Sequence, residues 1–234
     1  MGVGVAVGGY GVAFGAASIS AGFSPAQTSV SSLLTFTGGT QFAIAGVIAG
    51  GGTAAAALGS GYLLGARNTL YALRLKPVLG VRGWRRAVGA LVTIDESTAM
   101  ALGQANPGLS RLAFWWTAGA VYFFWNLATV LGALGAQALG DPRRFGLDAA
   151  VPAAFLALLA PRLRARAVPD NARDVSRGAG AVPRQTAAVP RRVALVGAII
   201  AVALIPVTPP GVPVLAACLS LAVVIDIRPL RRRP

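Results

Sequence analysis

The alternation of long apolar stretches with clusters of basic residues is the feature that most constrains this chain. Basic residues confined to loops between apolar spans are typical of the cytoplasmic side of a membrane protein, where they also face anionic lipid headgroups. The net charge of +14 therefore indicates membrane topology rather than nucleic-acid binding. Seventeen of the 21 basic residues lie in three clusters: Arg74, Lys76, Arg82, Arg85 and Arg86; Arg162, Arg164, Arg166, Arg173, Arg177, Arg184, Arg191 and Arg192; and Arg228, Arg231, Arg232 and Arg233.

The composition supports the same conclusion. Hydrophobic residues make up 55% of the chain and charged residues 12%, whereas soluble globular proteins carry about 25% charged residues. Half that charge density leaves too little polar surface to cover a folded body in water. A length of 234 residues fits one compact unit, so we predict a single transmembrane transporter domain over residues 1–234.

Apolar segments set the expected number of helices, because a helix needs about 20 residues to span a bilayer. We predict an all-α integral membrane protein, a polytopic helical bundle of about seven spans with one re-entrant or broken segment. Gly2–Gly22 is glycine-rich, reads as interrupted, and lacks the basic lead of a cleaved signal. Val168–Pro190 is polar and without hydrophobic periodicity, which predicts a flexible cytoplasmic loop. The apolar segments are Gly2–Gly22, Thr28–Gly50, Thr53–Leu73, Ala87–Gln104, Leu112–Leu139, Leu147–Ala160, Val193–Pro206 and Val212–Ile227.

The basic clusters also predict the topology. Clusters 74–86 and 162–192 should both face the cytoplasm, so the chain between them crosses the membrane an even number of times. Three apolar segments lie there, and Ala87–Gln104 carries Asp95 and Glu96 at its middle. Carboxylates facing lipid are costly, so we expect this segment to enter the protein and return. The last two segments then form a hairpin that leaves the C-terminus in the cytoplasm.

Strongly polar residues within the apolar segments are the candidates for a substrate or proton pathway. Each has a structural alternative. Gln41 and Asn126 could make interhelical hydrogen bonds, Arg67 could extend to the membrane interface, and Asp148 could cap a helix start. Asp95 and Glu96 would be ordinary solvated acids if their segment lay at the surface. The candidates are Gln41, Arg67, Asn68, Tyr71, Asp95, Glu96, Asn126 and Asp148.

Some site classes are excluded by what the chain lacks. It contains no histidine and a single cysteine, Cys218. Zinc sites of the Cys/His kind and Ser-His-Asp or Cys-His catalytic sets therefore cannot form, and we predict neither a metal, a cofactor nor an enzyme. Interrupted segments at matching positions of two halves, here Gly2–Gly22 and Ala87–Gln104, would mark a transporter's central binding site. Glycine pairs four residues apart predict helices that approach closely: Gly4/Gly8, Gly11/Gly15, Gly46/Gly50 and Gly61/Gly65.

An ordered set of motifs resembles the AzlC-like family, the large subunits of bacterial branched-chain amino acid exporters. The resemblance implies export of valine, leucine, isoleucine or analogues across the bacterial inner membrane, with a small hydrophobic AzlD-like subunit as partner. Asn68 stands where this family commonly has histidine. A non-transporting scaffold or chaperone subunit for another permease is the alternative function. The motifs are YGVAFGAASISAGFSP (Tyr10–Pro25), TFTGGTQFA (Thr35–Ala43), ARNTLYALRLKP (Ala66–Pro77), TIDEST (Thr93–Thr98) and GLDAAVPAAFLALL (Gly146–Leu159).

Overall fold

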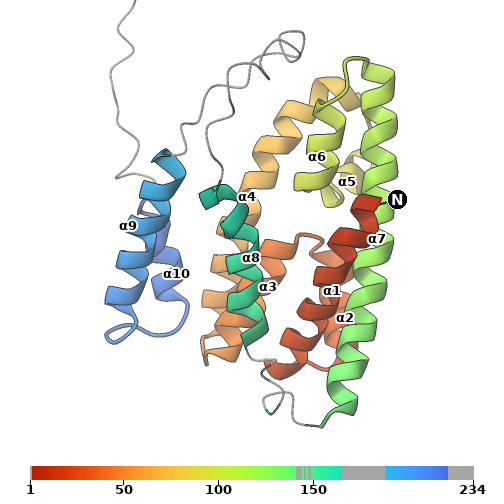
Figure 1. The fold of residues 1–234 in the computed structure, drawn as a ribbon. Helices are drawn as coiled ribbons and strands as arrows, with labels where there is room; N and C mark the ends of the chain where they lie inside the picture. The colour runs from red at the N-terminus through yellow and green to blue at the C-terminus, as the bar shows by residue number, and fades with distance from the viewer. Residues whose placement is uncertain (1, 141–143, 145, 147–148, 165–187, 221–234) are drawn as a thin grey trace, which may run out of the picture.

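The computed structural model describes residues 2–140, 144, 146, 149–164 and 188–220, and within them it contains helices and no strands (Figure 1). The prediction of an all-α protein is confirmed for these residues. Two of the helices, α1 and α7, are long and apolar enough to cross a membrane, so the structure does not confirm seven spans. The helices are α1 (Gly2–Ser20), α2 (Pro25–Leu34), α3 (Gly38–Ala49), α4 (Ala54–Leu79), α5 (Trp84–Leu91), α6 (Asp95–Leu102), α7 (Pro107–Ala138), α8 (Ala150–Arg164), α9 (Ala188–Leu204) and α10 (Val212–Ala217).

Helix α1 is continuous, so the expected interruption of Gly2–Gly22 is wrong. Its glycines at positions 4, 8, 11 and 15 are buried and form the face that contacts α7. A Cβ on Gly15 would lie 2.6 Å from the backbone nitrogen of Ala133, and one on Gly132 would collide with the carbonyl oxygen of Val12. The helix therefore persists despite the low propensity of glycine, because the missing side chains allow backbone-to-backbone packing.

The segment expected to run unbroken from Thr28 to Gly50 is instead divided into α2 and α3 by a turn at Thr35–Thr37. A capping box between Ser24 and Gln27 starts α2. At the other end, the Gln41 amide nitrogen donates to the carbonyl oxygens of Ser32 at 3.3 Å and Thr35 at 2.8 Å. These bonds satisfy carbonyls that a helix end leaves without partners, so the break is stable inside the protein.

Segment Ala87–Gln104 is also divided, into α5 and α6, which confirms the prediction of a broken segment. Its turn is held by Ser97, whose hydroxyl donates to the Val92 carbonyl oxygen at 2.9 Å and accepts from the Ile94 backbone N–H at 3.1 Å. Both acidic residues of the segment lie in the first turn of α6. Carboxylates are favoured there because a helix N-terminus carries partial positive charge.

Helices α4, α8, α9 and α10 complete the described part of the fold. Helix α4 extends beyond the expected Leu73 to Leu79, and Arg111 of α7 donates its Nε to the Val78 carbonyl oxygen near that end at 2.8 Å. Helices α9 and α10 form a hairpin beside α4 and α8 (Figure 1). Ala188–Pro190, expected as the end of the flexible loop, form the first turn of α9. The rest of that loop, Asp148 and the end of Val212–Ile227 lie outside the described residues.

Candidate functional site

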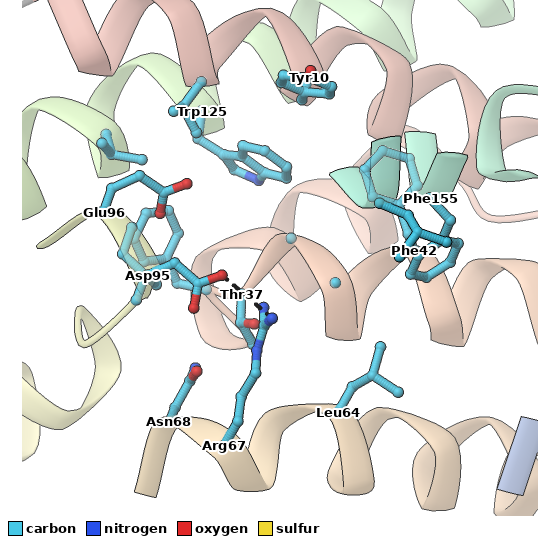
Figure 2. Close-up of a pocket in the computed structure, with 17 residues that line it drawn as sticks. Tyr10, Thr37, Phe42, Leu64, Arg67, Asn68, Asp95, Glu96, Trp125 and Phe155 are labelled. Atoms are coloured by element: carbon cyan, nitrogen blue, oxygen red, sulfur yellow. Dashed lines mark ion pairs between the residues drawn. The ribbon is translucent and has the colours of Figure 1, made fainter. Parts of the chain in front are cut away.

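A cavity of about 380 Å³ lies beside the first turns of α3 and α6, the helices that follow the two breaks (Figure 2). Helices α1, α4, α7 and α8 also line it. Val121 and Trp125 line it from near the midpoint of the 32-residue helix α7. Its size falls within the range of about 300–1,000 Å³ that is usual for small-molecule sites. The lining residues are Val7, Tyr10, Phe36, Thr37, Gly38, Gly39, Phe42, Leu64, Arg67, Asn68, Ile94, Asp95, Glu96, Val121, Trp125, Phe155 and Leu159.

The charged groups gather at one side of the cavity. Arg67 and Asn68 come from α4, and Asp95 and Glu96 come from the first turn of α6 (Figure 2). Arg67 Nη1 lies 3.3 Å from Asp95 Oδ2, and the two side chains keep 40% and 34% of their surface exposed. Their ion pair is therefore open to a ligand in the cavity rather than sealed in the core.

The opposite side of the cavity is aromatic and aliphatic. Phe42 of α3 and Phe155 of α8 face each other edge-on with ring centroids 6.3 Å apart, and Figure 2 shows them on the side away from Asp95 and Glu96. Behind them, Phe14 of α1 contacts Phe42 edge-on at 5.7 Å and stacks on Trp125 at 6.4 Å. The cavity thus has a charged end and an apolar end, which suits a small amphiphilic ligand.

The start of α3 borders the cavity with backbone rather than side chains. A Cβ on Gly38 would lie 2.9 Å from Cη2 of Trp125, and one on Gly39 would lie 3.4 Å from Nη2 of Arg67. Thr37, at the N-cap position, makes no side-chain hydrogen bond to the first turn. The backbone N–H groups of this turn have no intrahelical acceptor, and Gly38 and Gly39 both line the cavity.

Four of the predicted site residues meet at the cavity: Arg67, Asn68, Asp95 and Glu96. Arg67 forms an ion pair with Asp95 beside α3. Asp95 and Glu96 both line the cavity although they are adjacent in the sequence. Tyr71, further along α4, does not line it.

Gln41 and Asn126 lie outside the cavity lining as well. Gln41 is 3% exposed, and besides its two bonds to α2 it accepts a hydrogen bond of 3.0 Å from Nε1 of Trp125. Asn126 donates to the Tyr122 carbonyl oxygen of its own helix at 2.8 Å. For Gln41 the structure favours the alternative role of an interhelical hydrogen-bonding residue. Its side chain links the end of α2 to Trp125 of α7, which lines the cavity. Asp148 lies outside the described residues.

Sequence reasoning missed the residues that shape the cavity without carrying charge. The glycine pair Gly38–Gly39 after Thr37 carried a usable signal. Two glycines at a helix start cost conformational entropy, so their presence suggests a close approach of other groups to the backbone. Phe42, Phe155 and Tyr10 carried none, because an aromatic residue in an apolar segment has the same pattern whether it faces lipid, core or cavity.

Broken helices whose ends meet at a cavity near the middle of a long apolar helix are the arrangement typical of secondary membrane transporters. The sequence model of the AzlC protein family matches residues 2–139, more than half of the chain, so the chain belongs to the AzlC family. This is a transporter-type family rather than an enzyme family, it is associated with branched-chain amino acid transport, and its members work with a partner subunit. No curated protein and no solved structure gave a match.

Proposed function

We propose that this chain is the large subunit of a secondary transporter that exports valine, leucine, isoleucine or close analogues together with a small AzlD-like membrane subunit. The observation that carries the proposal is the cavity with a charged end and an apolar end. A branched-chain amino acid has the same division: an ammonium and a carboxylate at one end and an aliphatic side chain at the other.

The charges of the cavity support an amino acid over an uncharged solute. A carboxylate of Asp95 or Glu96 is the natural partner of the substrate's ammonium group, and the other holds the geometry of the helix break or carries a coupling proton. The aliphatic side chain would contact Phe42 and Phe155 at the opposite end. Burying a branched aliphatic side chain contributes roughly 1.5–3 kcal/mol, so both ends of the cavity add to binding.

The proposed location is the bacterial inner membrane, crossed several times, with the C-terminus in the cytoplasm. Helices α4 and α8 end, and α9 begins, toward the end of the bundle where α5 lies, whereas the α9–α10 turn lies at the opposite end (Figure 1). This arrangement agrees with the basic clusters at 74–86 and 162–192 sharing one side of the membrane.

The partner subunit is proposed because of the family membership. The glycine pairs do not support it, because they pack against other helices of this chain. Gly61 and Gly65 of α4 contact Thr40 and Ile44 of α3, and Gly46 contacts Val151 of α8. The close packing that these glycines predicted is therefore used within the chain. We therefore expect the partner to bind a surface other than these glycines.

An efflux assay tests the function. Cells lacking their own exporters are loaded with branched-chain dipeptides, which hydrolyse inside, and release of the free amino acids is followed. We expect rapid efflux when this chain is expressed with its small subunit, and little or none from either subunit alone. Full efflux from the purified single chain after reconstitution would show that no partner is needed. No efflux from this chain, with or without the small subunit, would favour a scaffold or chaperone role.

A further inference from the structure

Arg67 is the one cationic side chain among the described residues that line the cavity. Its closest approach to Asp95, 3.3 Å, is longer than the roughly 2.7–2.9 Å of a strong charge-assisted hydrogen bond. Its Nε is buried, and within the described part of the chain no acceptor reaches it. The ion pair with Asp95 therefore leaves part of the guanidinium's hydrogen-bonding capacity unused.

The surroundings of Arg67 favour an anion. Its Nη2 lies beside Gly39, 3.4 Å from the position that a Cβ there would take, so the guanidinium adjoins the first turn of α3. That turn has no side-chain cap, and its N–H groups carry the partial positive charge of a helix start. An anion bound to Arg67 would therefore also lie close to these backbone donors.

The charges of the cavity lining are those that a free amino acid would complement. Among the residues that the structure describes there, they consist of one cation, Arg67, and two carboxylates, Asp95 and Glu96. A substrate carboxylate on Arg67 and a substrate ammonium on Asp95 would each lie against an opposite charge, and Glu96 would remain to hold the helix break or carry a proton. A ligand lacking its carboxylate would leave Arg67 on Asp95, and that acid would not be available to the ammonium.

We infer that Arg67 binds the carboxylate of the substrate and exchanges its ion pair with Asp95 for it, so that the cavity selects free α-amino acids over amines and amides of the same shape. This inference rests on the proposed function and names the chemical class that the site accepts. The apolar wall of Phe42 and Phe155 then fixes the direction of binding, because the aliphatic side chain must point away from α6.

Competition in the wild-type transporter tests the inference without a mutation. Membrane vesicles holding this chain and its small subunit export labelled leucine in the presence of isoleucine, leucinamide or 4-methylpentanoate. We expect isoleucine to compete, and the two analogues to compete at least about tenfold more weakly, since each lacks one charged group and loses its hydrogen bonds to the site. Leucine export that leucinamide inhibits as well as isoleucine overturns this inference alone. Absence of leucine export overturns the proposed function and the inference with it.

Variants at Arg67 give a second readout. We expect Arg67→Gln to lower leucine export at least about tenfold and to reduce the discrimination between leucine and leucinamide, which loss of fold alone would not do. Arg67→Lys keeps the charge but loses the planar fork, so its export should be intermediate. The control is Arg74→Gln, an exposed position on the same helix, at matched membrane levels. Wild-type export and discrimination in Arg67→Gln would overturn the assignment.

Discussion

Asp95 and Glu96 are adjacent, yet the start of α6 brings both to the cavity. Residues in the first turn of a helix have no preceding turn beside them, so two neighbours can border the same space even though their side chains diverge by about 100°. Asp95 pairs with Arg67, whereas Figure 2 shows Glu96 on the side toward Trp125. This difference gives the two acids different neighbours in one site.

Neutral isosteres test the acids separately. We expect Asp95→Asn and Glu96→Gln each to reduce export, and the one that binds the ammonium to reduce it at least about tenfold, because a charge-assisted hydrogen bond is lost. Efflux is measured from mildly acidic to mildly alkaline pH, with Asp170→Asn in the predicted cytoplasmic loop as the control. If both variants reach normal membrane levels and export at the wild-type rate throughout, the two acids are structural.

At the scale of the elements, the described part of the fold contains two helix breaks and close packing at glycines, of which the crossing of α1 and α7 is one instance. The breaks at Thr35–Thr37 and Val92–Ile94 are closed by hydrogen bonds from Gln41 and Ser97. The crossing of α1 and α7 brings backbones into contact. Helices in an apolar surrounding depend on such close packing, because the hydrophobic effect does not drive them together there.

The crossing can be tested with matched glycine substitutions. A Cβ at Gly15 or Gly132 would meet backbone atoms of the opposing helix, whereas one at Gly9 or Gly135 would meet nothing within 4 Å. We expect Gly15→Ala and Gly132→Ala to destabilise the protein by about 1–3 kcal/mol, as overpacking commonly does. Gly9→Ala and Gly135→Ala should be neutral or stabilising by up to about 1 kcal/mol.

Thermal unfolding of the purified protein in detergent measures these four variants side by side. A fall in Tm confined to Gly15→Ala and Gly132→Ala is the expected result. Equal Tm values for all four variants would mean that α1 and α7 do not approach as closely as the structure has them.

At the scale of the whole molecule, the basic clusters and the arrangement of the helices both bear on the membrane topology. Exposed Arg85 of α5 lies in the first basic cluster, and exposed Val207 lies in the turn after α9. These positions are toward opposite ends of the bundle (Figure 1). They should therefore face opposite sides of the membrane.

Cysteine labelling checks the topology in a Cys218→Ser background, since Cys218 is the only native cysteine. We expect Arg85→Cys and Arg177→Cys to resist a membrane-impermeant thiol reagent in intact cells and to react after permeabilisation. Val207→Cys should react in intact cells and serves as the positive control. Labelling of Arg177→Cys from outside would reverse the proposed orientation.

The sequence by itself determined the class of protein and the second helix break. Apolar length and charge placement decide membrane insertion because the transfer free energy of a segment depends on that segment's own residues. Asp95 and Glu96 marked the break at α6 in the same local way. The break at Thr35–Thr37 contains no charged residue. The apolar segment Thr28–Gly50 was therefore predicted as one helix.

Only the tertiary structure decided which residues share the cavity. Arg67 and Asp95 come from different helices, as do Phe42 and Phe155, and none of these pairs is close in the sequence. Gln41 has the polar side chain of a pathway residue, but its hydrogen bonds to Trp125 and α2 make it part of the framework. Periodicity describes one helix at a time, whereas a binding site forms from the packing of several, because helices in an apolar surrounding are matched by shape and hydrogen bonding rather than by hydrophobicity.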